Sequence, residues 1–377
     1  MKIELLVPGR AYSFSNQARA LQSALKTAGV ESIVTLISAN EPYVNKQDLD
    51  VIIPVCDWRD YESTIIPALN SGVPVIPWIV IDTVNGQVEG DDVGIRDGLA
   101  RLPLFFTTSN FCKSNFVKIG IPAEKISILP ECVDEDIWKP YTEEELQRFL
   151  DFVSIDEESK TSLPLHFNLR RAKKEGIPII FTTGGSGIWK GTLEILKALG
   201  KIDAAKEWIY IIKTWPATGS FESGIVEMQT AKDNNVAHKL HYMSGEFADD
   251  FMVGLMNVCD IYVAVSRLEG FGLPLVEAQL CNKMVVTHNA TATMETIVEG
   301  VTGLMVQAYI QPDGMARADI PDLAEKLERA IDDKELRETL SAQARQSAID
   351  RFGKQAIGKQ CLSMVRDALL KMGKNIE

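Results

Sequence analysis

The residues best suited to chemistry stand in one short stretch, Ser266–Ala278, which reads SRLEGFGLPLVEA. A buried-looking apolar run precedes it, two glycines give a tight turn, and Pro274 falls in the first turn of a following helix, where its missing N–H costs nothing. The backbone N–H groups and the dipole at such a helix N-terminus suit an anion such as a diphosphate. The stretch therefore predicts an anion site, formed by Gly270, Phe271, Gly272 and Leu273.

Two carboxylates flank this predicted site, Glu269 before the turn and Glu277 one turn into the helix. A carboxylate beside a phosphate would be repelled, so both are expected to contact neutral hydroxyl groups. We expect Glu269 to contact a sugar and Glu277 to contact a ribose. The alternative is that both are ordinary surface acids at a junction between a strand and a helix.

A second glycine-rich turn, with the sequence TTGGSGIWKG, covers residues 182–191. Glycines let the backbone approach a phosphate closely, and a lysine at the turn supplies the cation that a departing diphosphate requires. The turn predicts Lys190 as that cation, beside backbone contacts from Gly184, Gly185, Ser186 and Gly187. A plain connection between a strand and a helix is the alternative.

The segment EGFGLPLVE resembles the E-x7-E motif of the retaining glycosyltransferases of family 4, which have the GT-B fold of two facing Rossmann-like domains. Further similar segments are Pro130–Asp134 with Trp138–Pro140, Asp260–Val263 with Ser266, and Glu295–Leu304. The resemblance implies a nucleotide-diphosphate sugar as donor and transfer with retention of anomeric configuration. It also implies that the donor phosphate takes the proton of the acceptor on the same face.

The sequence departs from this family at the diphosphate. The family uses an Arg and a Lys together, and Lys190 matches the Lys, whereas Gly185 stands about where the Arg is expected. Arg267 and Arg10 are the candidate substitutes. The departure keeps open whether the protein is active.

The family also suggests residues on the acceptor side, in the first domain. Gly9, Arg10 and Tyr12 belong to the loop that leaves the first strand, where the family often has paired glycines. Family members commonly have a first-domain His near the transferred sugar, but none of the four histidines of this sequence falls in the core of that domain. Asp82 is the candidate replacement, or else a loop acid that caps the next turn.

The donor base is expected at the end of the strand Leu240–Met243, where Met243, Ser244 and Phe247 offer backbone groups and an apolar wall. Core packing is the alternative for Phe247. The triplet Asp134-Glu135-Asp136 spells the metal-binding DxD of a different glycosyltransferase fold, which we interpret as accidental. Because helix N-termini and Lys190 can neutralise the leaving diphosphate, no metal is implied.

These residues require an alternation of short apolar strands and amphipathic helices, which the sequence provides twice. It predicts an α/β protein with two doubly wound, Rossmann-like domains, residues 1–170 on the acceptor side and 171–352 on the nucleotide-sugar side, followed by a C-terminal helix, 353–377, that can cross back to the first domain. The predicted strands are Lys2–Val7, Ser32–Leu36, Val51–Val55, Val73–Ile79, Leu104–Thr107 and Lys125–Leu129, then Pro178–Thr182, Trp208–Ile212, Leu240–Met243, Ile261–Val265, Val285–Thr287 and Gly303–Val306.

Composition excludes several classes of protein. The 377 residues include 39 Lys and Arg against 52 Asp and Glu, a net charge of −13, which does not suit a polyanion-binding surface. The six cysteines are scattered without zinc-type spacing, as in a reducing compartment. The N-terminus reads as a strand and no apolar run could span a bilayer. We expect a soluble, cytoplasmic protein, with peripheral membrane contact left open.

The sequence thus predicts a retaining glycosyltransferase. A sugar-nucleotide epimerase of the same fold and a nucleotide-sugar-binding protein without turnover remain as alternatives. The acceptor can be a glycan, a lipid, a protein or a modified nucleic acid. The sugar, the base and the oligomeric state are not predicted.

Overall fold

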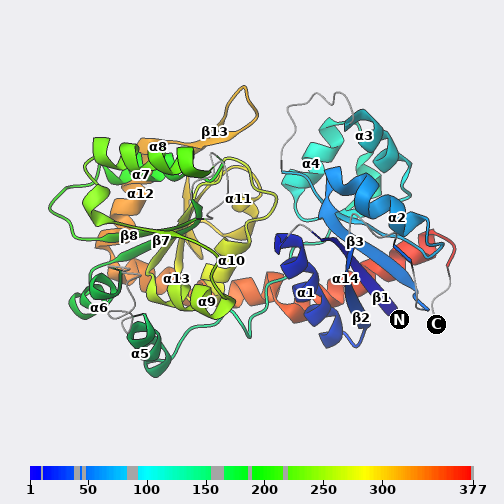
Figure 1. The fold of residues 1–377 in the computed structure, drawn as a ribbon, viewed down its shortest axis with the longest axis horizontal. Coiled ribbons are helices and arrows are strands. Elements are labelled where there is room, and N and C mark those ends of the chain that lie inside the picture. Colours follow the sequence, from blue (N-terminus) through cyan, green and yellow to red (C-terminus); the bar gives the residue numbers. More distant parts are fainter. Residues whose placement is uncertain are drawn as a thin grey trace. The chain divides into compact units, whose positions relative to one another are not determined.

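The computed structural model describes the whole chain except residues 10–11, 38–42, 45–47, 83–91, 154–164, 186–188, 215–219 and 375–377. Its contacts divide the chain into two compact units (Figure 1). The first unit comprises Met1–Glu135, Glu269–Phe271 and Ile349–Glu377, and the second comprises Asp136–Leu268 and Gly272–Ala348.

The first unit is built on a six-stranded parallel sheet in the order β2-β1-β3-β4-β5-β6. The direction of strand succession reverses between β1 and β3, which is the switch point where such sheets bind ligands. The strands are β1 (Lys2–Pro8), β2 (Glu31–Ile37), β3 (Val51–Asp57), β4 (Trp78–Val80), β5 (Phe105–Thr107) and β6 (Ile126–Ile128). The helices are α1 (Tyr12–Thr27), α2 (Ile66–Leu69), α3 (Asp92–Arg101), α4 (Asn110–Lys118) and α14 (Lys354–Lys371).

The second unit has a six-stranded parallel sheet in the order β12-β11-β10-β7-β8-β9. Numbered within the unit, this is the order 3-2-1-4-5-6 of dinucleotide-binding folds, with its switch point between β7 and β10. The strands are β7 (Ile179–Gly185), β8 (Ile209–Thr214), β9 (Leu240–Ser244), β10 (Ile261–Ala264), β11 (Met284–His288) and β12 (Gly303–Val306). The helices are α5 (Glu143–Phe152), α6 (Leu165–Glu175), α7 (Thr192–Leu199), α8 (Ser220–Asp233), α9 (Asp249–Val258), α10 (Leu273–Leu280), α11 (Thr293–Thr296) and α12 (Ile320–Asp332), while α13 (Lys334–Phe352) runs on into the first unit.

Helices cover both faces of the second sheet, so its strands read as continuous apolar runs. On one face, Tyr210 and Ile212 of β8 pack with side chains of α7 and α12. On the other face, Ile211 packs with Phe181, Met243 and side chains of α9 and α10. Two cores therefore hold the ends of β7, β8 and β9 in fixed positions.

The predicted domain boundary at residue 170 differs from the observed division. Residues after Glu135 group with the second unit, because Phe149 and Leu150 of α5 and Leu169 of α6 are buried in the core beside α9. The two helices α5 and α6 thus pack as part of the second unit.

The C-terminal segment completes the first unit. α13 ends at Phe352, Gly353 interrupts the helix, and α14 packs against α1. At Gly358 the two helices touch so closely that an added Cβ would lie 2.1 Å from the carbonyl oxygen of Ala24. The absence of a side chain at Gly358 is therefore what lets α14 reach α1.

Two other elements differ from the sequence prediction. The strand predicted at Val73–Ile79 becomes β4 at Trp78–Val80, preceded by a single bridge from Val75 to Ile52. Pro74 and Pro77 lack the N–H groups that a longer ladder needs. An antiparallel hairpin, β13 (Ala308–Ile310) and β14 (Ala316–Ala318), was not predicted.

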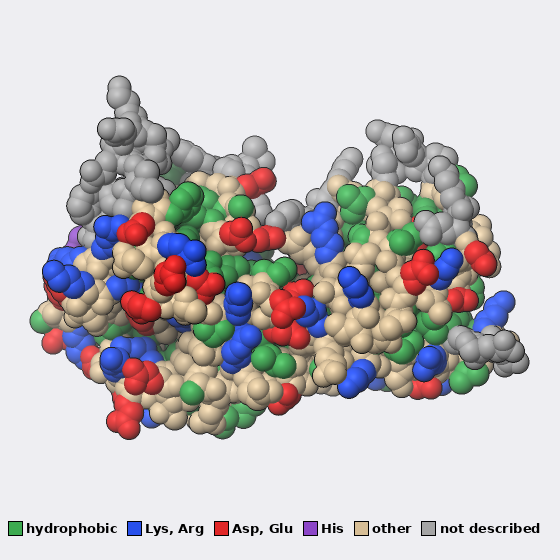
Figure 2. All heavy atoms as spheres, turned by 90° about the horizontal axis from the view of Figure 1, so that it is seen from below, with side chains coloured by type: hydrophobic (Ala, Val, Ile, Leu, Met, Phe, Trp, Pro, Cys, Tyr) green, Lys and Arg blue, Asp and Glu red, His purple; other side chains and the backbone are tan. Residues whose placement is uncertain are grey.

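The basic side chains of α6 form ion pairs within the second unit. Arg170 and Arg171 of α6 form ion pairs with Asp151 and with Glu175 and Glu207. Positive and negative side chains are interspersed on the face drawn in Figure 2. No helix in the described part of the chain is long and apolar enough to cross a membrane.

The DxD triplet has structural partners of its own. Asp134 pairs with the ammonium group of Lys354 at 2.6 Å, and Glu135 accepts a hydrogen bond from the Lys354 N–H at 2.9 Å. Both carboxylates thus hold the start of α14. All six cysteines are buried and unpaired.

Candidate functional site

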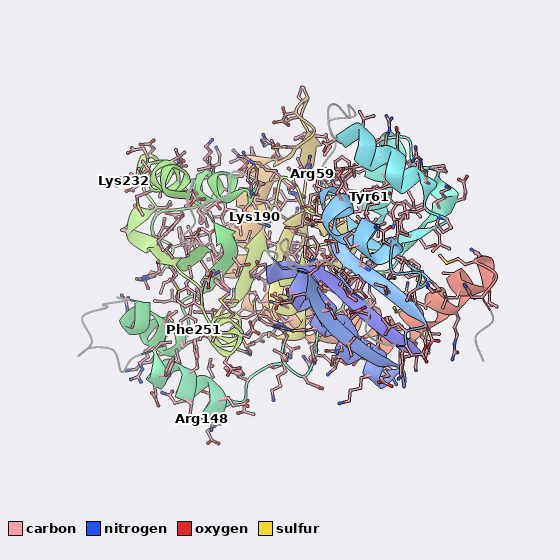
Figure 3. The ribbon with its side chains drawn as sticks, turned by 45° about the vertical axis from the view of Figure 1, so that its right-hand side comes forward. Arg59, Tyr61, Arg148, Lys190, Lys232 and Phe251 are labelled. Atoms are coloured by element: carbon pink, nitrogen blue, oxygen red, sulfur yellow. The ribbon has the colours of Figure 1, made fainter. Side chains whose placement is uncertain are left out.

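The glycine-rich loop after β7 lies at the switch point of the second sheet. A Cβ added at Gly184 would lie 3.2 Å from Cε of Lys190, so the lysine stem passes directly over this glycine. Gly191 has a φ of +72°, and a Cβ there would lie 2.1 Å from the carbonyl oxygen of Val265. Only glycine fits that conformation and that approach. Lys190 is thereby fixed between β7 and α7 (Figure 3).

The loop after β10 is bonded directly to this glycine-rich loop. The N–H of Arg267 donates to the carbonyl oxygen of Trp189 at 2.6 Å, and the carbonyl oxygen of Arg267 accepts from the N–H of Ala316 at 3.0 Å. The carbonyl oxygen of the buried Ser266 accepts from Nε2 of His288 at 2.8 Å. Three segments far apart in the sequence therefore meet at Ser266 and Arg267.

His288 acts here as a neutral structural group. Its Nδ1 accepts from the N–H of Ala290 at 3.2 Å, so the proton resides on Nε2 and points to Ser266. The side chain is fully buried, and burial lowers the pKa of the imidazole. A neutral His288 matches the neutral carbonyl that it contacts.

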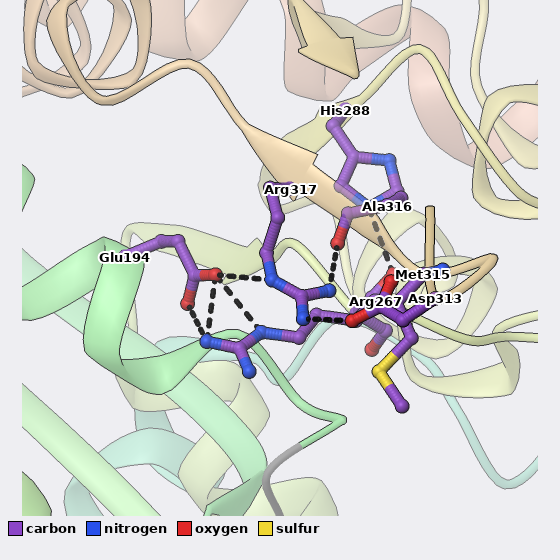
Figure 4. A network of polar contacts seen from close by, with 8 residues as sticks. Glu194, Arg267, His288, Asp313, Met315, Ala316 and Arg317 are labelled. Carbon is purple, nitrogen blue, oxygen red and sulfur yellow. Dashed lines mark hydrogen bonds and ion pairs between the residues drawn. The ribbon is translucent and has the colours of Figure 1, made fainter. Parts of the chain in front are cut away.

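Arg267 was predicted to contact the donor, yet its guanidinium is engaged with Glu194 of α7. Its Nε and Nη2 donate to the two carboxylate oxygens at 2.9 and 3.0 Å, and both side chains are mostly buried (Figure 4). Nε of Arg317, on β14, lies 3.9 Å from the same carboxylate. Paired bidentate contacts of this kind fix geometry. The structure thus gives Arg267 the role of joining α7, the motif loop and the hairpin.

The N-terminus of α10 forms the other side of the switch point. Gly272 has a φ of +98°, and its carbonyl oxygen accepts from the N–H of Leu275 at 3.0 Å. Pro274 occupies the first turn, where no N–H is needed. This is the helix N-terminus predicted from the sequence.

Glu277 lies one turn into α10 and is only partly exposed. Burial raises the pKa of its carboxyl group to about 8, and the negative charge of Asp249 adds to the shift. A protonated or poised carboxyl group here can bond to hydroxyl groups as a donor and as an acceptor.

The turn Glu269–Phe271 groups by its contacts with the first unit. The carbonyl oxygen of Gly270 accepts from Oγ1 of Thr108 at 2.9 Å and from Oγ of Ser109 at 2.8 Å. A Cβ added at Gly270 would lie 2.5 Å from Oδ1 of Asp82. The predicted residues Glu269 and Asp82 therefore belong to one compact group, in which glycine is required for space.

The predicted base-binding residues follow β9. Met243 is buried, Ser244 is exposed, and the ring of Phe247 is stacked on Phe251 of α9 with 4.9 Å between centroids. Phe251 is labelled in Figure 3. Met243 belongs to the core, whereas Ser244 and the partly buried Phe247 leave polar and apolar surface at the strand end.

The predicted acceptor-side loop is described only in part. Gly9 donates its N–H to Ile37 of β2 at 3.0 Å, and α1 begins at Tyr12. Arg10, like Ser186 and Gly187 of the donor loop, lies outside the described residues. Within the described residues, no group of three or more His, Cys, Asp or Glu side chains could hold a metal ion.

Two side chains at this site were missed in the sequence. Glu194 follows Gly191 in the first turn of α7, but its partner Arg267 is 73 residues away and no local pattern pairs them. Lys213 is 5% exposed at the end of β8, where its charge directly after an apolar run was the available signal.

Residues 169–347 match the family described as Glycosyl transferases group 1. A capsular polysaccharide biosynthesis glycosyltransferase of Staphylococcus aureus is 32% identical over 112 residues, which cover 30% of this chain and 27% of that protein. An alpha-D-kanosaminyltransferase of Streptomyces kanamyceticus is 24% identical over 33% of this chain and 30% of its own length. The chain thus matches about a quarter to a third of the length of these curated relatives.

Solved structures resemble the whole chain. HepE of Anabaena, crystallised with UDP-glucose, has a TM-score of 0.75 at 16% identity and covers 97% of this chain and 100% of its own. A glycosyltransferase of Rickettsia africae has a TM-score of 0.72 at 16% identity, with 98% of both chains covered. These similarities confirm the predicted α/β GT-B fold.

Proposed function

We propose that the chain is a retaining glycosyltransferase of the family 4 type, which transfers a sugar from a nucleotide-diphosphate sugar to an acceptor. The observation that carries the proposal is the bonded pair of loops at the switch point of the second unit, where Lys190 and the N-terminus of α10 share one edge of the sheet. Ligands of doubly wound sheets bind at this edge. The match of residues 169–347 to group 1 glycosyl transferases supports the same function.

Each side chain then has a distinct role in donor binding. Lys190 and the α10 N-terminus bind the diphosphate, Glu277 bonds to the ribose, and the segment after Met243 receives the base. Glu269 is the E-x7-E carboxylate that orients the sugar. Phosphate binding by a lysine and by helix N–H groups combines charge with fixed donors.

The chemistry is leaving-group stabilisation. The bond from the anomeric carbon to the diphosphate oxygen breaks, and the acceptor oxygen forms its new bond on the same face of the sugar. The acceptor proton passes to the departing phosphate oxygen, so atoms and charge balance. Preorganised cations and dipoles lower the energy of the developing negative charge. We propose that no metal is needed, which predicts unchanged turnover in excess chelator.

The acceptor is assigned to the first unit, with Gly9, Arg10, Tyr12 and Asp82 as its candidate contacts. We also propose that the protein acts in a reducing compartment such as the cytoplasm, because its six buried cysteines are unpaired.

Incubation with UDP-, GDP- and ADP-sugars, followed by mass spectrometry, tests the proposal. Release of the free nucleoside diphosphate supports it. Formation of an isomeric donor would instead indicate the epimerase, and binding without any turnover would indicate the non-catalytic protein. NMR of the transferred sugar then reports whether the anomeric configuration is retained.

A further inference from the structure

The turn that carries Glu269 is crowded at the next residue, Gly270. A Cβ added there would lie 2.5 Å from Oδ1 of Asp82, 2.6 Å from Cγ1 of Val80 and 3.2 Å from Sγ of Cys112. No side chain fits in that space, and glycine is also the residue whose backbone is least restricted. A turn that must contain glycine needs contacts from other segments to keep one conformation.

Two hydroxyl groups make such contacts with the carbonyl oxygen of Gly270. Oγ1 of Thr108 donates to it at 2.9 Å, and Oγ of Ser109 donates at 2.8 Å. The two side chains are 2% and 1% exposed, and they lie 162 and 161 positions away from Gly270 in the sequence. All three residues belong to the first unit. Since a carbonyl oxygen has two lone pairs, two hydroxyl groups can fix its direction.

The hydroxyl group of Ser109 is itself held in place. Ser109 is the N-cap of α4, and its Oγ accepts from the N–H of Cys112 at 3.1 Å. The hydroxyl group has one proton to donate, and that proton goes to the carbonyl oxygen of Gly270. Two hydrogen bonds thus run in series from the helix N–H through Ser109 to the turn, and bonds in series strengthen one another.

The residue after Gly270 is fixed by its ring. Phe271 is 3% exposed, and its ring meets the ring of Phe352 edge-on, with 5.3 Å between centroids. The carbonyl oxygen of Phe352 accepts from the N–H of Val133 at 3.0 Å. Glu269, in contrast, is partly exposed. Buried contacts at the two following residues therefore hold the backbone from which this carboxylate extends.

We propose that Thr108 and Ser109 are positioning residues for Glu269, which keep its carboxylate in the orientation that sugar transfer requires. The proposal rests on the proposed function, in which Glu269 orients the sugar. A group that orients a substrate must itself be held, because an error of about 1 Å in its position can cost roughly a hundredfold in rate. Both hydroxyl groups act through the backbone of the turn and not on the substrate.

Thr108→Val tests the proposal by steady-state kinetics, because it removes one hydroxyl group and keeps the shape of the side chain. We expect kcat to fall about 3- to 10-fold, the worth of one neutral hydrogen bond, while KM for the sugar donor changes at most about twofold. Thr108→Ser keeps the hydroxyl group and should restore kcat. Thr107→Val is the matched control, because the buried Thr107 donates at 2.7 Å to the carbonyl oxygen of Ile79, outside the motif.

A double-mutant cycle shows whether Thr108 acts through Glu269. In a Glu269→Gln background, Thr108→Val should lower kcat by less than about twofold, because the carboxylate that Thr108 positions is then absent. An equal loss in both backgrounds would overturn the proposal. Ser109→Gly is a second probe if Thr108→Val folds poorly. Glycine is tolerated at an N-cap, so this variant should show the same pattern.

The outcomes separate the two proposals. If the wild type transfers no sugar from any donor, the proposed function fails and the role of Thr108 fails with it. If the wild type is active and Thr108→Val loses no more kcat than Thr107→Val, only the positioning role is overturned. Similar falls in melting temperature for the two valine variants, with a loss of kcat confined to Thr108→Val, support the proposal.

Discussion

The two sheets differ in the hydrogen bonding of the loops at their switch points. In the second unit the loops after β7 and β10 are joined by the hydrogen bond between Trp189 and Arg267. The backbone of Gly191 also packs against Val265, directly after β10, too closely for any side chain. In the first unit, the described residues at the corresponding strand ends bond to adjacent segments. Gly9, directly after β1, donates its N–H to Ile37 of β2, and Asp57, the last residue of β3, caps the helical turn that follows it.

The hydrogen bond between the two loops makes the second switch point the better candidate for a preorganised site. Loops that are bonded to each other hold their N–H groups and charges in place before a ligand arrives, which is what stabilisation of a diphosphate requires. Loops whose hydrogen bonds go only to adjacent segments do not fix each other, so the geometry of a site between them is less constrained. Substitutions at the second switch point should therefore disturb stability and donor chemistry together.

The largest effect is expected from Arg267→Met. This change leaves the buried Glu194 with Arg317, 3.9 Å away, as its remaining ion-pair partner among the described residues. Breaking a buried ion pair on one side costs about 3 kcal/mol or more, so urea denaturation should show a loss of that order in unfolding free energy. The double variant Arg267→Met with Glu194→Gln should recover much of it. A loss below 1 kcal/mol in the single variant would mean that the two loops do not depend on this pair.

Glu269→Gln tests the donor chemistry of the motif. If the carboxylate orients the sugar in the transition state, turnover should fall roughly 10- to 150-fold while donor affinity changes little, since one charge-assisted contact is worth about 1.5 to 3 kcal/mol. Steady-state kinetics with the active donor measures both quantities. Glu325→Gln, on the exposed side of α12, is the control. Unchanged turnover would remove Glu269 from the mechanism.

Lys190→Ala tests the cation of the glycine-rich loop. Affinity for the nucleoside diphosphate should fall about thirtyfold, and affinity for the nucleoside much less, because phosphate contacts are charge-assisted. Calorimetry with both ligands gives the comparison, and the exposed Lys197→Ala on α7 serves as control. Equal losses for both ligands would assign Lys190 to packing.

For the first unit, Gly358→Ala probes the contact between α14 and α1. The new methyl group would meet the Ala24 carbonyl, and overpacking of this kind costs about 1 to 3 kcal/mol, less the small gain in helix propensity. Gly94→Ala in α3 meets no atom within 4 Å and should be neutral or slightly stabilising. Thermal unfolding compares the two variants. Similar melting temperatures for both would show that α14 and α1 can move apart at little cost.

The last prediction concerns pH and Glu277. With its pKa raised to about 8, the folded state keeps the proton while the unfolded chain loses it near the usual value of 4.5. Stability due to the neutral carboxyl group is therefore lost progressively as pH rises from about 4.5 to 8, and is constant above that. Glu277→Gln should gain in melting temperature relative to wild type across this window. A difference independent of pH would contradict the raised pKa.

The second sheet could be predicted well from the sequence, because buried parallel strands read as apolar runs bounded by glycine turns. The motif loop was predictable for a related reason, since the positive φ at Gly272 favours glycine and Pro274 fits the first turn of a helix. The hairpin β13–β14 was missed because its strands have three residues each, and Tyr309 and Ile310 are exposed, so no burial pattern marks them.

Pairings across long sequence separations could not be predicted. Arg267 was assigned to the donor because it adjoins the motif, and nothing local reveals that its guanidinium meets Glu194. Lys213 was passed over because a charge at the end of a strand normally reaches solvent. Its exposed fraction of 5%, in a strand paired on both sides, is visible only in the folded structure.

The arrangement of α14 also bears on the order of synthesis. The face of α1 that carries Leu21, Ala24 and Leu25 is covered by side chains of α14, so the first unit needs residues beyond 348 to be complete. At roughly 5 to 20 residues per second, a ribosome takes about 10 to 40 s to pass from residue 135 to residue 349. During that interval the N-terminal segment holds an uncovered apolar helix face, because α14 has not yet been synthesised. Nascent chains of this protein are therefore expected to depend on chaperones at their N-terminal end.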